Sequence, residues 1–184
     1  MSLFMMEPAA AALRAFEEWA HSNQASFRFI FAPELGWGGR VDRATEDEKS
    51  GALIDMTRMD KDGKPLFRGV SFISCARILA SKIGGIVLER RAWRSSPEVA
   101  DIEWIERAVR KVDGARMTLF LLPYSGWSAE FLVHGGPSAS NLPGWGSAGP
   151  SYRYVTSDEH PGEKLSFHAA VCDVRSAAGK AEYV

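Results

Sequence analysis

The pattern of apolar and polar residues predicts helices at several places along the chain. Between Pro8 and Ala20 apolar side chains recur at helical spacing, and Asn23 ends this segment. The clearest signal covers residues 95–114, where Ser95 or Ser96 caps a helix whose first position is Pro97. A shorter helix is predicted over 75–83, capped by Ser74. The apolar stripe of the 95–114 helix comprises Val99, Ile102, Ile105, Val109 and Val112.

Runs rich in apolar, β-branched and aromatic residues predict the strands. Two glycine-rich segments, 32–50 and 135–151, show neither a helical nor a strand period and are expected to be long loops. No internal repeat of fixed period is apparent. Turns at 60–64 and 123–127 predict two hairpins. The predicted strands are 26–31, 53–59, 66–73, 86–93, 115–122, 129–134, 152–156 and 165–174.

This order of elements predicts an α+β fold, in which a mixed, mostly antiparallel sheet carries about three helices packed mainly on one face. The chain has 184 residues, the length of one domain, and 46% of them are hydrophobic, enough to bury a core. We expect a single domain over residues 5–176. Residues 1–4 are expected to be an added or disordered leader, and residues 177–184 a frayed tail.

Charge and cysteine content narrow the classes of partner and cofactor. The formal net charge of −1 argues against nucleic acid as the main partner. There is no apolar stretch long enough to cross a membrane and no secretory signal, so the expected location is cytoplasmic. Cys75 and Cys172 lack the spacing of a zinc site and are expected to be buried thiols. No metal and no other cofactor is expected.

Three tryptophans lie among glycines in segments predicted as loops, namely Trp37, Trp127 and Trp145. A flat apolar ring in a flexible segment suits a surface that stacks on a ligand or anchors a partner protein. In the alternative interpretation, each tryptophan folds back and seals the edge of the core beneath its loop.

Titratable side chains near the second glycine-rich loop supply a different possibility. Glu130 and His134 lie on the preceding strand, and together with His168 they outline a hydrolase site with residues 135–151 as a lid. His168 and Cys172 share one face of the predicted last strand. Because a strand rises about 3.3 Å per residue, about 13 Å of chain would separate these two residues, so no Cys/His pair is expected.

We therefore expect a non-catalytic binding protein, such as an inhibitor or immunity-type partner of another protein. Its contact surface would contain Trp37, Trp127, Glu130, His134 and Trp145. Two alternatives stay open: a small-molecule binder that uses the same loops, and a hydrolase with its site near Glu130, His134 and His168. The sequence does not decide whether the chain is an enzyme, and it leaves the oligomeric state open.

Overall fold

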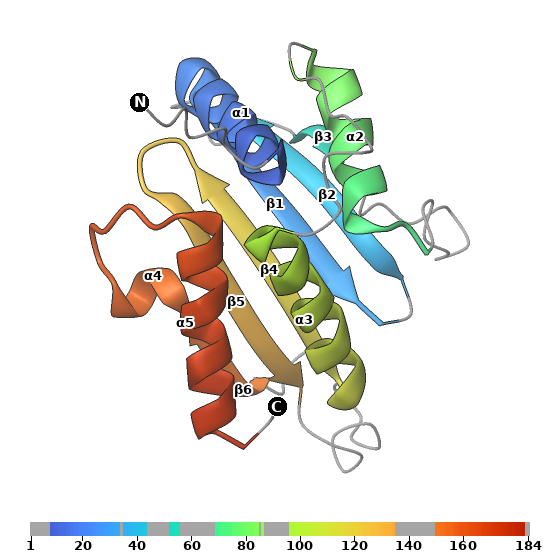
Figure 1. Cartoon of the computed structure of the whole chain (residues 1–184), viewed down its shortest axis with the longest axis vertical. Coiled ribbons are helices and arrows are strands. Elements are labelled where there is room, and N and C mark those ends of the chain that lie inside the picture. Colours follow the sequence, from blue (N-terminus) through green and yellow to red (C-terminus); the bar gives the residue numbers. More distant parts are fainter. Residues whose placement is uncertain are drawn as a thin grey trace, which may run out of the picture.

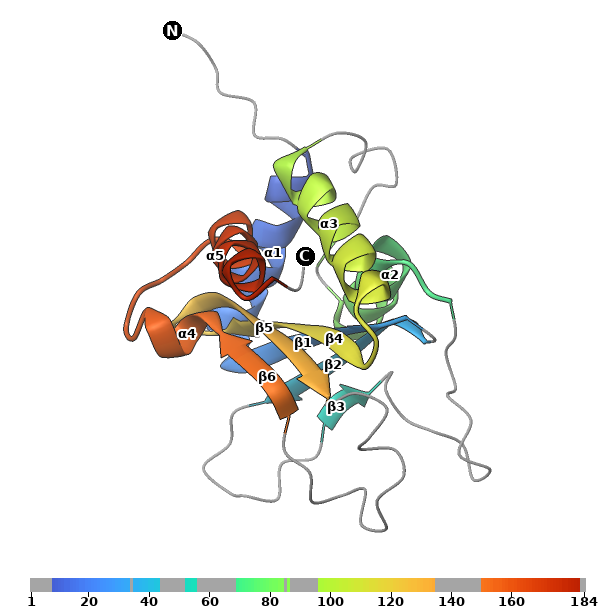
Figure 2. The same ribbon diagram turned by 90° about the horizontal axis from the view of Figure 1, so that it is seen from below.

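The computed structural model describes residues 8–33, 35–43, 52–55, 69–84, 86, 96–134 and 150–182. This part of the chain forms a six-stranded sheet of order β3-β2-β1-β4-β5-β6, with the long helices on one face (Figures 1 and 2). The strands are β1 (Ala25–Ala32), β2 (Gly36–Arg43), β3 (Ala52–Asp55), β4 (Ala115–Leu122), β5 (Gly126–His134) and β6 (Pro150–Val155). The helices are α1 (Pro8–Asn23), α2 (Phe72–Ile83), α3 (Pro97–Lys111), α4 (Thr156–Glu159) and α5 (Phe167–Lys180).

The α+β class is confirmed, and the helices exceed the predicted number. All pairs of named strands are antiparallel, and parallel pairing is limited to two isolated bridges among the described residues. The 95–114 helix is confirmed as α3, whose N-cap Ser96 accepts a hydrogen bond from the backbone N–H of Val99. The hairpin of β4 and β5 is confirmed as well.

The segment after β1 is a strand, so the prediction of a long loop over 32–50 is wrong for residues 36–43. Its glycines allow helix α2 to approach the sheet closely. A Cβ atom on Gly39 would lie 2.6 Å from Cδ1 of Leu79 and 2.8 Å from Sγ of Cys75. Because three positions of β2 are glycines without a side chain, the sequence of this segment lacks the alternation of apolar and polar residues that indicates a strand.

Helices replace most of one predicted strand and the last two residues of another. Helix α2 begins at Phe72 and is capped by Ser71 instead of Ser74, so it includes the end of the predicted 66–73 strand. Most of the predicted 165–174 strand belongs to α5, which is capped by Ser166 and extends into the predicted tail. Alanines fill much of its buried stripe, which hid the helical spacing. The buried residues of α5 are Phe167, Ala170, Val171, Val174 and Ala178.

Several predicted segments lie outside the described residues. These are most of the 86–93 strand, the whole 60–64 turn with the adjoining parts of the strands on either side, and the 135–149 part of the second glycine-rich loop. None of the helices in the described part of the chain is long and apolar enough to cross a membrane.

The sheet consists of two halves with the same order of elements. The first half runs α1-β1-β2-β3-α2, and the second runs α3-β4-β5-β6-α5 with the short helix α4 inserted before α5. Strands β1 and β4 lie side by side at the centre, and each half continues outward to its own edge strand. One hydrophobic cluster contains buried residues from both halves.

Identical residue types occur at equivalent positions of the two halves. Gly36 and Gly126 both have positive φ. The backbone N–H of the tryptophan that follows each glycine donates to the carbonyl oxygen of the residue just before a helix-capping serine. The two halves therefore form an internal repeat, although the sequence has no repeat of fixed period, as expected. A Pro-x-x-Gly-Trp motif occurs twice, although unequal connections elsewhere disturb a fixed period. The matched pairs are Pro33 and Pro123, Gly36 and Gly126, Trp37 and Trp127, Ser71 and Ser166, and Phe72 and Phe167.

Candidate functional site

Trp37 and Trp127 are core residues, which corrects their expected place on exposed loops. They lie in β2 and β5 and are only 1% and 2% exposed. Each indole N–H donates a 2.8 Å hydrogen bond to a glutamate of a covering helix, Glu106 and Glu17 respectively. The two rings therefore do not lie on exposed loops, although Trp127 is among the residues that line a pocket beside the β4–β5 turn, and a role for it in binding stays a prediction. Trp145 lies outside the described residues.

The structure does not bring Glu130 and His168 together. Glu130 points away from the helices, because its neighbour Phe131 is fully buried on the helix side and strand residues alternate. The Glu130 carboxylate accepts a 2.8 Å hydrogen bond from Nε of Arg153 on β6. His134 is exposed at the end of β5. A role for Glu130 or His134 in binding stays a prediction.

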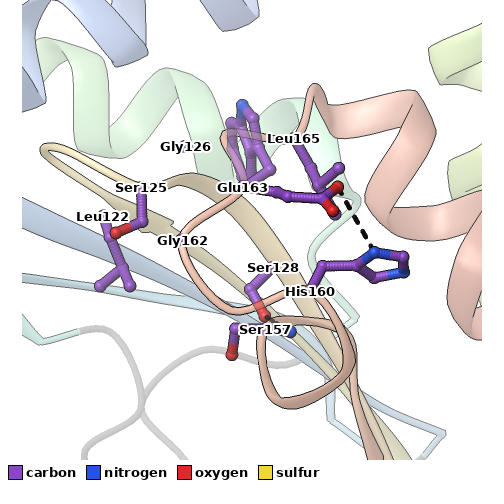
Figure 3. A pocket seen from close by; sticks show the side chains of 10 residues that line it. Leu122, Ser125, Gly126, Ser128, Ser157, His160, Gly162, Glu163 and Leu165 are labelled. Carbon is purple, nitrogen blue, oxygen red and sulfur yellow. Dashed lines mark hydrogen bonds and ion pairs between the residues drawn. The ribbon is translucent and has the colours of Figure 1, made fainter.

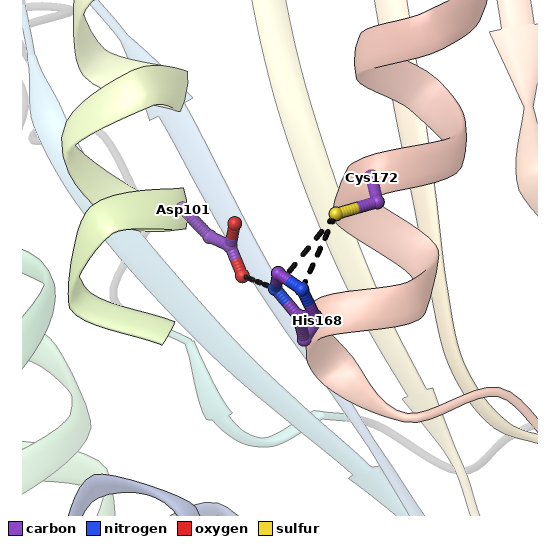
Figure 4. A group of neighbouring side chains, drawn as sticks. All are labelled: Asp101, His168 and Cys172. Carbon is purple, nitrogen blue, oxygen red and sulfur yellow. Dashed lines mark hydrogen bonds and ion pairs between the residues drawn. The ribbon is translucent and has the colours of Figure 1, made fainter. Parts of the chain in front are cut away.

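Helix α5 instead brings His168 and Cys172 together, and α3 adds Asp101 (Figure 4). The Cys172 Sγ atom lies 3.5 Å from Nε2 of His168 and 3.8 Å from Nδ1. Nδ1 lies 2.6 Å from Oδ2 of Asp101. Residues four apart share one face of a helix, whereas the strand prediction had separated this pair. A serine cap and the helical spacing of the apolar residues were the signals that could have revealed it.

The three groups differ in burial, and the pKa values of Asp101 and Cys172 are both raised. Asp101 is 4% exposed, and burial raises its carboxyl pKa, against the effect of the His168 hydrogen bond. The His168 side chain is 50% exposed, and Cys172 lies at the surface. Burial of the sulfur and the charge of Asp101 raise the pKa of the Cys172 thiol, while Arg175 lowers it. At neutral pH Cys172 is therefore a thiol that needs a base to ionise it.

The first half of the molecule is an internal comparison for this cluster. Both α1 and α3 begin with proline, and both α2 and α5 begin with a Ser-Phe pair. When these starting residues are aligned, Asp101, His168 and Cys172 match Ala12, Ile73 and Arg77 of the first half, in that order. The same arrangement of helices and sheet thus forms without a carboxylate, an imidazole and a thiol, so the fold alone does not require the cluster.

A pocket of about 220 Å³ lies elsewhere, between the β4–β5 turn and the segment that precedes α5 (Figure 3). Ser125, Ser157, His160 and Glu163 are among its lining residues, and no member of the Asp101 cluster lines it. Its histidine is engaged on both sides, since Nδ1 lies 3.4 Å from Glu163 and Nε2 lies 3.3 Å from Asp173. His160 therefore lacks a ring nitrogen to serve as a base for the nearby serines.

We expect His160 to stabilise the fold most at acidic pH. The hydrogen bond with Asp173 and the charges of Asp173 and Glu163 raise the His160 pKa above 6.5. A raised folded-state pKa adds stability that is full below the unfolded value and is lost as pH rises through the folded value. Replacing His160 with glutamine should thus lower the melting temperature more at about pH 5.5 than at about pH 8.5. His134→Gln serves as a control, and an equal loss at both pH values would contradict the ion-pair role.

Compared with known proteins, the chain matches no protein-family model, no curated protein and no solved structure. The functional interpretation therefore depends on the Asp101, His168 and Cys172 geometry itself.

Proposed function

We propose that the chain is a thiol-dependent hydrolase with Cys172 as its nucleophile. The observation that carries the proposal is the order of the three groups. A buried carboxylate holds Nδ1 of an imidazole, and a surface thiol lies nearest to Nε2 of the same ring. Nucleophile, base and orienting acid stand in this order in known hydrolytic triads, and such triads are recognised by geometry instead of sequence position.

The chemistry divides into two steps. In the first, Nε2 of His168 takes the thiol proton while Cys172 Sγ forms a bond to the carbonyl carbon of an ester or thioester. The bond to the leaving group breaks, and His168 returns the proton to that group. In the second, His168 takes a proton from water, whose oxygen attacks the acyl carbon. The carbon–sulfur bond breaks, and the proton returns to Cys172.

Asp101 supports this cycle in two ways. Its hydrogen bond at Nδ1 leaves Nε2 as the ring nitrogen with the free electron pair, and its charge stabilises the imidazolium formed during the reaction. The sulfur lies beside the ring, at similar distances from both nitrogens. A side-chain rotation, which the exposed positions of His168 and Cys172 permit, is needed to align Sγ with Nε2.

A burst experiment with p-nitrophenyl acetate tests the proposal. We expect one equivalent of p-nitrophenol per chain, released at least about 100-fold faster than by a simple free thiol, because a positioned base contributes about that much. Mass spectrometry of the quenched protein should place the acetyl group on Cys172. Cys172→Ala should abolish the burst.

Cys75 provides the matched control thiol. It is fully buried, and burial raises its pKa to about 12, so Cys75→Ala should retain the burst. A triple variant replaces the three cluster residues with those at the aligned positions of the first half of the molecule. Its substitutions are Asp101→Ala, His168→Ile and Cys172→Arg. This variant should fold and be inactive. A burst that persists in Cys172→Ala, or an acetyl group on another residue, would overturn the proposal.

A further inference from the structure

The same helix face offers the two donors that bind soft divalent metals most readily. His168 and Cys172 are spaced like paired metal ligands on one helix face, which hold a single ion when they are four residues apart. Thiolate and imidazole favour zinc over calcium and magnesium, which prefer oxygen ligands. The donor atoms of Asp101, His168 and Cys172 all lie within 4.8 Å of one another.

The Sγ–Nε2 distance matches that of a tetrahedral centre, and a rotation of the exposed Cys172 side chain would supply the direction. Zinc binds sulfur at about 2.3 Å and nitrogen at about 2.0–2.1 Å, so two such ligands at the tetrahedral angle lie about 3.5 Å apart. The Cys172 Sγ atom lies at this distance, 3.5 Å, from Nε2 of His168, but it also lies 3.8 Å from Nδ1, so it stands beside the ring and has to rotate into the direction of the Nε2 electron pair to share an ion with it. By contrast, the 2.6 Å separation of Asp101 Oδ2 and His168 Nδ1 is a hydrogen-bond distance, too short for two ligands of one zinc ion.

We infer that Zn²⁺ binds to this site through Nε2 of His168 and Sγ of Cys172, while Asp101 holds the ring from Nδ1. Metal-bound histidines almost always donate their other N–H to a carboxylate or carbonyl, and that partner fixes the direction of the ring. Asp101 already makes this contact from its buried position on α3. Water or substrate would complete the coordination sphere.

Zinc binding would remove the groups that the hydrolase needs. Each ion bound replaces the thiol proton of Cys172, which is released to solvent, and occupies the electron pair of Nε2. The ion would therefore inhibit acylation of Cys172 and protect the sulfur from alkylation. The inhibition rests on the proposed function, whereas binding and protection do not.

A cobalt titration without substrate tests the inference. Co²⁺ replaces Zn²⁺ in such sites and gives a sulfur-to-cobalt charge-transfer band in the near ultraviolet. We expect this band at one equivalent of metal per chain, and we expect Zn²⁺ to abolish it. Cys172→Ser should remove the band, and Asp101→Asn should weaken binding about 10–100-fold. Cys75→Ala should leave the titration unchanged, since Cys75 is buried on the face of α2 that packs on β2.

Labelling with iodoacetamide is a second measurement. In the wild type, Zn²⁺ should slow the alkylation of Cys172 at least tenfold, because the bound ion occupies the sulfur. Circular dichroism confirms that each variant is folded. Absence of the band in the wild type, its persistence in Cys172→Ser, or one metal per two chains would overturn the inference. A band without an acetyl burst would remove only the hydrolase proposal, and a burst without a band would remove only the zinc site.

Discussion

Replacing Trp37 with alanine is expected to lower the free energy of unfolding by about 3–5 kcal/mol, the usual cost of deleting a large buried ring. The indole packs edge to face on Phe72, with ring centroids 4.9 Å apart, and lies 5.2 Å from Phe31. Its removal would leave a cavity between β2 and the start of α2. Glu106 would keep its ion pair with Arg110 at 3.4 Å, so the loss should come mainly from the cavity.

Denaturant unfolding of three variants separates the contributions. Trp37→Phe retains much of the ring but loses the hydrogen bond to Glu106, so its loss should be smaller, about 1–3 kcal/mol. Tyr124→Ala is the control, because Tyr124 is 64% exposed and should change stability by less than about 0.5 kcal/mol. A Trp37→Ala protein as stable as the wild type would show that Trp37 is not a core residue.

Removing the imidazole of His168 is expected to have the largest effect on activity after the loss of Cys172 itself. His168→Gln should slow acylation of Cys172 by about 10²–10⁴-fold, the usual contribution of a positioned general base. The initial rate of p-nitrophenol release, compared between the wild type and the variant, measures this loss.

Asp101→Asn separates a role in positioning from a role in folding. An asparagine amide can donate to Nδ1 and so favour the tautomer that carries its proton on Nε2, which cannot accept the thiol proton. The rate should therefore fall by at least about 100-fold. Because burial raises the Asp101 pKa, its charge is unfavourable in the folded state at neutral pH, and melting temperature should hold or rise.

His134→Gln is the control for loss of an exposed imidazole and should leave the rate unchanged. A parallel loss of stability and activity in Asp101→Asn would assign Asp101 to the fold. An unchanged rate in His168→Gln would exclude His168 as the base.

The sequence alone predicted those elements whose ends are marked by capping or turn residues. Helix α3 has Ser96 and Pro97 at its start and a continuous apolar stripe, so its position follows from the sequence. The β4–β5 hairpin is likewise marked by two apolar runs around a turn that contains Pro123 and Gly126. Together with length and hydrophobic content, these elements sufficed for the α+β class.

Tertiary packing decided what the local signals left ambiguous. Strand β2 contains glycine where α2 approaches the sheet, and such positions have no side chains whose pattern could be recognised. The predicted 165–174 strand begins with Leu165 and Phe167 two residues apart, but the buried residues from Phe167 onward form a helical stripe against β5. A short apolar segment can fit either a helix or a strand by its pattern alone, and burial against a neighbouring element decides between them.

The candidate site exists because residues 167–180 form a helix and not a strand. On a strand, His168 and Cys172 would be too far apart to interact, whereas one helical turn brings them within 3.5 Å. Asp101 comes from a separate helix, and only the packing of α3 beside α5 places its carboxylate on the ring. The sequence supplied the three reactive groups. The proximity of His168 and Cys172 follows from the helical conformation of α5, whereas the position of Asp101 depends on contacts between residues distant in the chain, which local periodicity does not encode.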